Sequence, residues 1–376
     1  MKHEDRYYIK RALKLACINA GKTSPNPWVG AVVVKEGRII GEGLHIGAGF
    51  PHAEVEAIED AKRKGISLKG SSIYVSLQPC NTHGRTPPCT EIIKKEGIKK
   101  IFFSSYDPNI DQKSYRLKES IGGILKEDGD KILLPYFTFI TKKRPYIIIK
   151  LAQTLDGKIA DTTGKSKYMT SQKSLELVHK LRAHSNAVII GEKTLLKDNP
   201  MLNIRFLEEH KKIKFIKEKI QGEYPNPIKI IIDSDLSSLP QAFRMNIASG
   251  NNTVFVCTKQ PNFDPPKIKN ISFMTLRSSD DGKIELKSLS DFLYRCGVMI
   301  ALVEGGGMTA WEFIKQDLFD EIWVFISPII LGSGISVGGS NFFNLGNAKK
   351  LKIISIKKVG DDVLLRISKD KIWEIF

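Results

Sequence analysis

Short apolar runs alternate with segments of helical periodicity along most of the chain, and no other feature restricts the fold as much. Residues 6–20 carry apolar side chains at helical spacing, and residues 31–34 form a strand-like run. A second helical segment at residues 53–64 precedes a second strand-like run at residues 72–77. Alternating strands and helices build layered α/β structures rather than helical bundles or β-sandwiches. The sequence therefore predicts the α/β class.

The same alternation continues beyond these first elements. We expect further helices at residues 90–96, 171–182, 286–296 and 309–316, and further strands at residues 101–104, 146–151, 187–190, 228–232, 253–257, 299–303 and 321–326. Residues 206–227 are rich in Lys and Glu and are expected to form an exposed excursion from this core.

The length of 376 residues predicts two domains, since one domain takes roughly 100 to 200 residues. The basic segment from Thr141 to Pro145 is the expected linker, which places the domains at residues 1–142 and 146–376. Hydrophobic residues make up 41% and charged residues 26% of the chain, and this balance excludes disorder over most of its length.

The chain shows no signal for export or membrane insertion. The N-terminus lacks the apolar core of a secretory signal, and no apolar run approaches the roughly 20 residues that span a bilayer. We therefore expect a cytoplasmic protein with no membrane partner. The net charge of +17 suits an anionic partner, either nucleic acid or phosphorylated small molecules, or reflects only a Lys-biased surface.

Five sparse cysteines do not form a disulfide framework, so each is a buried thiol, a metal ligand or a nucleophile. Cys80 follows an expected strand, and Cys89 opens the next expected helix. His52 opens another helix after Pro51. One imidazole and two thiolates are the ligand count of a catalytic Zn²⁺ site, which keeps its fourth position for water.

Glu54 lies two residues after His52 and is the candidate proton carrier between water and a leaving amine. The pattern H-x-E, then P-C and a second Cys, is the signature of zinc-dependent hydrolytic deaminases. A structural zinc site, or two core cysteines beside a surface His, are the alternative interpretations.

A glycine run marks a second candidate site. Residues 299–304 form an apolar strand-like run that leads into Gly305, Gly306 and Gly307, and a helix is expected from Thr309. Such a junction brings backbone N–H groups close to a phosphate. The run does not fit the G-x-G-x-x-G pattern of dinucleotide-binding Rossmann sites, and a simple tight turn is the alternative.

Several motifs of the first half resemble the deaminase domain of the bifunctional riboflavin-biosynthesis deaminase/reductase family. These are S-P-N-P-W-V-G at residues 24–30, P-H-A-E-V at 51–55 and H-G-R-T-P-P-C at 83–89. Eight residues separate Cys80 from Cys89, whereas tRNA adenosine deaminases and cytidine deaminases usually have two. The resemblance implies a cytidine-deaminase-like three-layer domain in which Asn26, His83 and Arg85 approach the substrate. A turn residue between two prolines is the alternative interpretation of Asn26.

Two departures from that family's pattern affect the surroundings of the zinc site. Gln78 stands where the family usually has Glu before Pro-Cys, and residues 110–116 lack the family's spaced glycines. Neither departure changes a zinc ligand or Glu54, so we expect deamination to be retained.

The second half resembles the reductase domain of the same family, which is similar to dihydrofolate reductase in fold and uses NADPH. The resemblance rests on K-L-A-Q-T-L-D-G-K-I-A at residues 150–160, S-K-Y-M-T at 166–170, L-R-A at 181–183 and the segment from Gly191 to Pro200. It implies NADPH contacts at Ala152, Tyr168, Thr194, Asp198, Ser234, Gly306, Gly307, Met308 and Thr309, and substrate contacts at Ser166, Arg182, Leu202, Arg205 and Glu304.

Elementary chemistry agrees with these expectations. Arg182 and Arg205 can hold a phosphate by charge-assisted hydrogen bonds. Hydride transfer to a carbonyl needs a cation or donor at the developing oxyanion, and Lys150 and Asp156 are the candidates. Both could also be ordinary polar residues at a strand end.

Together the two resemblances imply a two-step enzyme of riboflavin biosynthesis. The expected steps are zinc-dependent deamination of 2,5-diamino-6-ribosylamino-4(3H)-pyrimidinone 5′-phosphate and NADPH-dependent reduction of the ribosyl group of the resulting uracil to ribityl. We expect phosphorylated pyrimidines as the partners, no nucleic acid, and a homo-oligomer. The alternatives are a reductase whose deaminase domain has lost catalysis, and a nucleic-acid-editing deaminase.

Overall fold

The structure is a computed structural model that describes residues 3–81, 87–110, 120–166, 169–205, 226–248, 252–259, 270–338 and 343–369. The described chain forms two compact units, with the division between Lys143 and Arg144.

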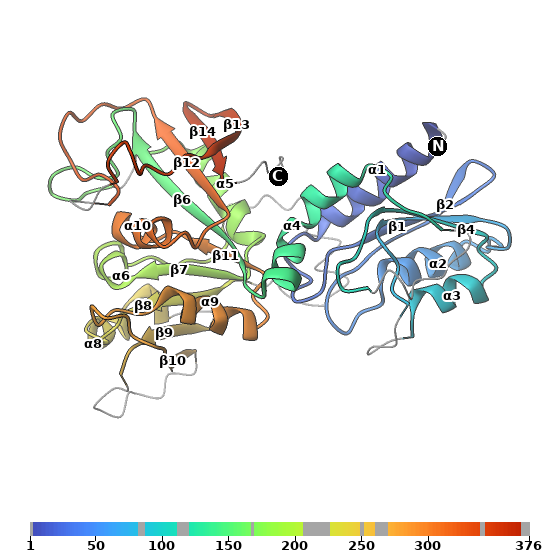
Figure 1. Ribbon diagram of the computed structural model, residues 1–376, viewed down its shortest axis with the longest axis horizontal. Coiled ribbons are helices and arrows are strands. Elements are labelled where there is room, and N and C mark those ends of the chain that lie inside the picture. Colours follow the sequence, from blue (N-terminus) through green and yellow to red (C-terminus); the bar gives the residue numbers. More distant parts are fainter. Residues whose placement is uncertain are drawn as a thin grey trace. The chain divides into compact units, whose positions relative to one another are not determined.

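The first unit contains a five-stranded mixed sheet flanked by helices (Figure 1). Its described strands are β1 (Gly30–Lys35), β2 (Arg38–Leu44), β3 (Ser72–Leu77), β4 (Lys100–Ser105) and β5 (Ser120–Ile121), in the order β2-β1-β3-β4-β5. Its described helices are α1 (His3–Ile18), α2 (Ala53–Arg63), α3 (Cys89–Lys95) and α4 (Lys126–Lys142). β1 pairs antiparallel with β2 and β3, whereas β3, β4 and β5 are parallel.

The alternation of side chains along β1 explains why helices cover both faces of this sheet. Ala31 and Val33 belong to a buried cluster with residues of α2 and α3, and Val32 and Val34 belong to a second cluster with residues of α1. Successive side chains of a strand point to opposite faces, so a strand that is buried throughout needs cover on both sides. The unit therefore has three layers, with α2 and α3 on one face of the sheet and α1 and α4 on the other (Figure 1).

The second unit contains a nine-stranded sheet in the order β10-β9-β8-β7-β11-β6-β12-β14-β13. Its described strands are β6 (Tyr146–Thr154), β7 (Ala187–Gly191), β8 (Ile228–Ile232), β9 (Thr253–Cys257), β10 (Ile271–Thr275), β11 (Ile300–Val303), β12 (Glu321–Ser327), β13 (Lys352–Val359) and β14 (Asp362–Ser368). Its described helices are α5 (Gln172–Ala183), α6 (Glu192–Asp198), α8 (Leu239–Ala242), α9 (Leu286–Arg295) and α10 (Gly307–Lys315), with a 3₁₀ turn at Asn246–Ala248.

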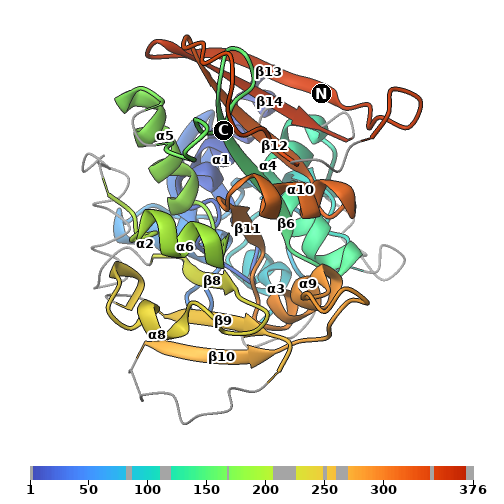
Figure 2. The same ribbon diagram turned by 90° about the vertical axis from the view of Figure 1, so that its left-hand side faces the viewer.

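Seven strands of this sheet, from β10 to β12, are parallel, and the β13–β14 hairpin adds two antiparallel strands at one edge (Figure 2). In parallel sheets, loops at the carboxyl ends of the strands gather on one edge and form ligand sites. The ends of β7, β8 and β11 carry residues predicted to bind NADPH.

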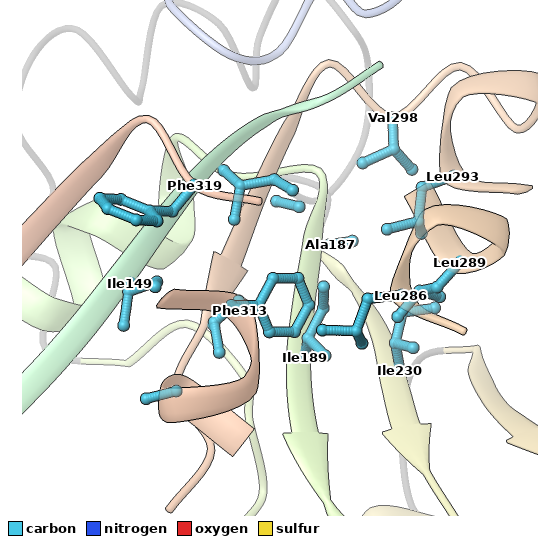
Figure 3. Close-up of a cluster of buried hydrophobic side chains, with 14 of the residues drawn as sticks. Ile149, Ala187, Ile189, Ile230, Leu286, Leu289, Leu293, Val298, Phe313 and Phe319 are labelled. Atoms are coloured by element: carbon cyan, nitrogen blue, oxygen red, sulfur yellow. The ribbon is translucent and has the colours of Figure 1, made fainter. Parts of the chain in front are cut away.

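Branched aliphatic side chains on the central strands form the core of the second unit. Ile149, Ile189 and Ile230 come from the parallel strands β6, β7 and β8, and Phe313 of α10 and Leu289 of α9 lie over them (Figure 3). The five are at most 2% exposed. Ala310 and Phe313 in this core anchor α10, the helix that follows Gly305 and Gly306.

Two ion pairs anchor the outer parts of this sheet. Arg144 lies just before β6, and Asp320 lies just before β12. The Arg144 guanidinium donates two hydrogen bonds of 2.7 Å to the Asp320 carboxylate. Further along, Glu321 accepts hydrogen bonds from Arg366 (3.0 Å), Trp323 (2.6 Å) and Tyr146 (3.1 Å), all of them buried. Because a buried carboxylate is costly without partners, this cluster ties β6, β12 and β14 together.

The expected α/β class is confirmed, and the expected helices and strands are present with ends that shift by a few residues. The elements that were not expected from the sequence are β2, β5, β10, α4, α6, α8, the 3₁₀ turn and the β13–β14 hairpin. The predicted linker is wrong at its start, because α4 continues through Lys142. Most of residues 206–227 lies outside the described residues. Among the described helices, none has both the length and the apolar character needed to cross a bilayer.

Candidate functional site

Three short segments of the first unit bring the predicted zinc ligands together. His52 is the residue before α2, Cys80 lies three residues after the end of β3, and Cys89 is the first residue of α3. Pro51, Pro79 and Pro88 each precede one of the three ligands. Because proline fixes φ, these segments reach the site with little conformational freedom.

The three ligand atoms are close enough to share one ion. His52 Nδ1 lies 3.2 Å from Cys89 Sγ and 3.7 Å from Cys80 Sγ, and the three ligand atoms lie within 4.8 Å of one another. Ligands about 2.0 to 2.3 Å from a tetrahedral Zn²⁺ are about 3.3 to 3.8 Å apart. One imidazole and two sulfurs at these spacings fit zinc and leave a fourth position open.

Hydrogen bonds favour the ionised form of Cys80. The pKa of its thiol is lowered to about 4, because Cys89 and His52 hydrogen-bond to the sulfur. The backbone N–H of Cys89 also donates to Cys80 Sγ at 3.3 Å. Thiolate is the form that binds metal, so the local structure prepares this ligand.

Glu54 is buried at 4% exposure in the first turn of α2. Burial raises the pKa of its carboxyl to about 7. A group with a pKa near neutrality can both accept and release a proton, which suits a general acid–base. Glu54 also interacts with both His52 and Cys89, so it lies beside the predicted metal position.

Close packing between β2 and α2 sets the position of His52 and Glu54. A Cβ atom on Gly41 would lie 2.1 Å from the Ala57 carbonyl oxygen. The helix therefore lies directly on the strand backbone, and only glycine allows that approach. β2 was not expected from the sequence, although it determines where the first turn of α2 lies.

Asn26 reaches the same region through His45, which the sequence analysis missed. The ring of His45 is 3% exposed and 5.5 Å from the His52 ring, edge to face. Its Nδ1 lies 3.0 Å from the Pro51 carbonyl oxygen, and its Nε2 lies 3.1 Å from Asn26 Nδ2. Since a carbonyl only accepts, Nδ1 carries the proton and Nε2 accepts from Asn26. The sequence offered only a lone His seven residues before His52, since the strand that it follows was not expected.

Gln78 keeps a hydrogen bond where the family usually has a carboxylate. Its Oε1 accepts from the Asp107 backbone N–H at 3.2 Å. The Asp107 carboxylate accepts from Asn109 N–H at 2.9 Å and from Tyr136 Oη–H at 3.1 Å. A neutral amide at position 78 thus avoids a second buried carboxylate beside Asp107. His83, Arg85 and residues 111–116 lie outside the described residues.

The second unit contains a buried charged cluster at the carboxyl ends of β6 and β11. Arg182 on α5 donates from Nε and Nη2 to the two oxygens of Glu304, at 2.5 and 2.7 Å. Lys150 on β6 is close enough to interact electrostatically with both residues, and burial lowers the pKa of its ammonium group. One carboxylate therefore faces two or more cationic groups, and the cluster favours an anionic ligand.

The glycine run is held by the end of β7 and by α6. The Gly306 N–H donates to Thr194 Oγ1 at 2.8 Å. A Cβ atom on Gly305 would lie 2.9 Å from Thr309, so the turn is closely packed. Gly306 and Met308 are nevertheless exposed, and the free N–H groups of the first turn of α10 fit a phosphate of a dinucleotide.

The other predicted residues of this unit occupy the loops around these two features. Asp198 ends α6 and Ser234 follows β8, whereas Ala152 lies on β6. Ser166 is exposed, and Leu202 is 3% exposed with φ of 50°. Tyr168 lies outside the described residues.

The Asp156 carboxylate connects the end of β6 to the loop that contains Leu331 and Gly332. Its carboxylate accepts from Thr154 Oγ1–H at 2.6 Å, Gly332 N–H at 2.8 Å and Leu331 N–H at 3.2 Å. These bonds lower its pKa to about 2. An ionised carboxylate cannot donate to a developing oxyanion, so Lys150 is the better candidate for that task.

The first unit thus has three convergent metal-ligand side chains next to a buried carboxylate, and the second has a glycine turn that fits a phosphate next to a cationic cluster. They define an enzyme in which a zinc-dependent deaminase domain precedes a reductase domain. Residues 2–105 match the cytidine and deoxycytidylate deaminase zinc-binding region, and residues 145–365 match the RibD C-terminal domain. The chain belongs to the RibD family of bifunctional riboflavin biosynthesis enzymes.

Similarity to individual RibD proteins extends over nearly the whole chain. The chain is 37% identical to riboflavin biosynthesis protein RibD of Aquifex aeolicus, covering 96% of this chain and 97% of the relative. It is 33% identical to RibD of Escherichia coli, covering 97% and 99%. A crystal structure of the deaminase/reductase of Thermotoga maritima superposes with a TM-score of 0.84 at 34% identity, covering 97% and 99%.

The expected fold, enzyme class and cofactors are therefore confirmed. The chain is a bifunctional enzyme of riboflavin biosynthesis, with a zinc-dependent deaminase domain like those of cytidine deaminases and an NADPH-dependent reductase domain.

Proposed function

We propose that the first unit removes the 2-amino group of 2,5-diamino-6-ribosylamino-4(3H)-pyrimidinone 5′-phosphate. The second unit then reduces the ribosyl group of 5-amino-6-(5-phosphoribosylamino)uracil to ribityl. Support comes from the Thermotoga maritima relative, which is named as a diaminohydroxyphosphoribosylaminopyrimidine deaminase and 5-amino-6-(5-phosphoribosylamino)uracil reductase. We assign the two activities to residues 1–142 and 146–376.

The observation that carries this proposal is the buried Glu54 beside the convergent His52, Cys80 and Cys89. In the proposed site the three ligands hold Zn²⁺, whose chemistry there is the activation of a water molecule. Glu54 accepts a proton from the attacking water and delivers it to the departing amino nitrogen as the carbon–nitrogen bond breaks. Its raised pKa lets one residue perform both transfers.

Asn26 is the proposed ring-recognition residue of this site. Because His45 accepts from the Asn26 amide nitrogen, Asn26 Oδ1 is oriented as an acceptor for an N–H group of the pyrimidine. The sequence-based prediction that Asn26, His83 and Arg85 approach the pyrimidine and its phosphoribosyl group is retained as part of this proposal.

In the second unit, NADPH is proposed to lie along Thr194, Asp198, Ser234 and residues 306–309, with Ala152 and Tyr168 on the nicotinamide side. The chemistry that NADPH would supply is a hydride to C1′ of the ribosyl group, the carbon bonded to the amino nitrogen. The bond from C1′ to the ring oxygen breaks, and Lys150 donates a proton to that oxygen, which becomes a hydroxyl of the ribityl chain. Arg205 binds the substrate phosphate, while Ser166, Arg182, Leu202 and Glu304 line the remaining substrate site.

We also propose that the enzyme is cytoplasmic and homo-oligomeric, with phosphorylated pyrimidines as its substrates. β13 is an edge strand of its sheet, and Ile353 and Ile356 on it are 62% and 64% exposed. Exposed apolar residues on an edge strand favour pairing with a second copy. Analytical ultracentrifugation of wild type and the Ile356→Lys variant tests this interface. If β13 forms it, the wild type sediments as an oligomer and the variant as a monomer.

One coupled assay tests the two activities together. Zinc-loaded protein is incubated with the diaminopyrimidinone substrate and NADPH, and ammonia release and NADPH oxidation are followed in the same cuvette. Release of one ammonia for each NADPH oxidised is expected. If only the deaminated substrate drives NADPH oxidation and no ammonia appears, the first unit is not a working deaminase and the departure at Gln78 becomes the first candidate cause.

A further inference from the structure

His179 of α5 lies beside the charged cluster and has no role in the function proposed above. His179 is 4% exposed, and its Nδ1 accepts a hydrogen bond of 2.9 Å from the Arg205 backbone N–H. The side chain therefore contacts the main chain of a loop 26 residues further along the sequence.

The loop of residues 203–205 is held at each of its three residues. The Asn203 carbonyl oxygen accepts from Arg182 Nη1 at 3.2 Å. The Ile204 N–H donates to Asn226 Oδ1 at 2.8 Å. The Arg205 N–H donates to His179, and the Asn203 backbone also hydrogen-bonds the His179 ring. None of these bonds uses the Arg205 side chain.

The protonation state of His179 suits this contact. Burial and the nearby charges of Arg182 and Arg205 lower the pKa of the imidazole to about 4. The ring is neutral at physiological pH, and Nδ1 must be unprotonated to accept from a backbone N–H. A fixed acceptor is thus provided where the Arg205 backbone needs one.

We propose that His179 is a positioning residue for substrate binding, which holds the backbone of Arg205 so that its guanidinium meets the phosphate of 5-amino-6-(5-phosphoribosylamino)uracil. The proposal rests on the phosphate-binding role of Arg205 given under the proposed function. Arg205 is exposed, and its Nη1 lies 2.8 Å from Met201 Sδ, which is only a weak acceptor, so fixing the backbone as well lowers the entropy lost on binding. Arg182 is fixed by its two bonds to Glu304.

Two substitutions separate the hydrogen bond from the packing of the ring. His179→Asn places a side-chain oxygen close to the position of Nδ1, whereas His179→Gln moves that oxygen toward the position of Nε2. We expect His179→Gln to raise the KM for the uracil substrate about tenfold, the value of one lost hydrogen bond, and His179→Asn to stay within about threefold of wild type. Both variants should keep kcat within about twofold and bind NADPH normally, and their thermal unfolding shows whether they fold.

Arg205→Ala distinguishes failure of this proposal from failure of the underlying function. If Arg205→Ala leaves the KM unchanged, the phosphate role of Arg205 is wrong. If it raises the KM while His179→Gln does not, only the positioning role is wrong. In the double variant, His179→Gln should add no further increase to Arg205→Ala, because His179 acts through Arg205. Equal increases in KM for the Asn and Gln variants would overturn the proposal and indicate packing alone.

Discussion

A Cβ atom on Gly43 of β2 would lie 2.2 Å from the carbonyl oxygen of Ala53, the first residue of α2. The same atom would lie 2.4 Å from the Ala57 backbone nitrogen. The strand and the helix are therefore in backbone contact at the turn that carries His52 and Glu54. Gly43, nine residues before His52, thus controls the position of the metal site.

Gly43→Ala is expected to move α2 away from β2 and to weaken the zinc site. Inserting a methyl group where there is no space costs about 1 to 3 kcal/mol of unfolding free energy. We expect a lower denaturant midpoint and weaker zinc binding in competition with a chelator. Gly47→Ala is the matched control, because a Cβ there meets its nearest atoms at 4.0 Å. Equal stability of the two variants would contradict the close-contact account.

Glu54→Gln is expected to abolish deamination without removing zinc. The amide keeps the size of the side chain but cannot carry a proton, and general acid–base catalysis contributes about 10² to 10⁴ in rate. Ammonia release should fall by at least about 100-fold, while zinc content and NADPH oxidation with the deaminated substrate remain at the wild-type level. His52→Ala, which removes a ligand, should lose zinc as well. Loss of zinc from Glu54→Gln would instead assign Glu54 a structural role.

Removing one partner of the buried Arg366–Glu321 pair is expected to destabilise the second unit strongly. Both residues are 1% exposed, so Arg366→Met leaves a carboxylate buried without its cation and costs about 3 to 5 kcal/mol. The additional change Glu321→Gln should restore part of this loss. Lys62→Ala is the control, because Lys62 pairs with Glu96 at 2.6 Å but is 41% exposed, and it should change stability by less than about 1 kcal/mol. Denaturant unfolding measures all three variants.

His179 is expected to make the protein sensitive to mild acid. Its pKa is about 4 in the folded protein, below the ordinary value of 6.5, so the unfolded chain binds the proton more readily. The stability contribution is complete above pH 6.5 and is lost as the pH falls from 6.5 to 4. Its size is at most about 3 kcal/mol, and screening by solvent reduces it to about 1 to 2 kcal/mol.

The measurement is urea unfolding of wild type and His179→Asn at several pH values between 4 and 7. The difference in unfolding free energy between wild type and His179→Asn should shift against the wild type as the pH falls through this window, since the Asn side chain does not titrate. A constant difference between the two proteins would show that His179 does not titrate below its ordinary pKa.

Much of this protein follows from local sequence patterns. The α/β alternation and Glu54 were predicted from residues a few positions apart, such as the two-residue step from His52 to Glu54. The zinc ligands lie up to 37 residues apart and were predicted from their residue types within a motif. An apolar residue at every second position indicates a half-buried strand, and apolar residues at helical spacing indicate a helix with one buried face. The residue types and spacing of a motif indicate which metal ion it can bind. Such signals need no knowledge of the tertiary structure.

Local patterns failed where packing overrides propensity. The two glycines of β2 lowered its strand propensity, yet close contact with α2 requires them. Gly129 and Pro135 likewise concealed α4, in which Gly129 packs against the side chains of Ser104 and Ser105. In each case the residue that breaks the pattern is the one that the neighbouring element needs.

Only the tertiary structure decided which side chains meet. Asn26 and His45 are 19 residues apart, and Arg182 and Glu304 are 122 residues apart, but both pairs are in direct contact. The sequence predicted Asn26, Arg182 and Glu304 as site residues by resemblance, and it missed His45 and His179. Partners at such separations are chosen by the sheet order and by burial of charge, and neither leaves a periodic signal in the chain.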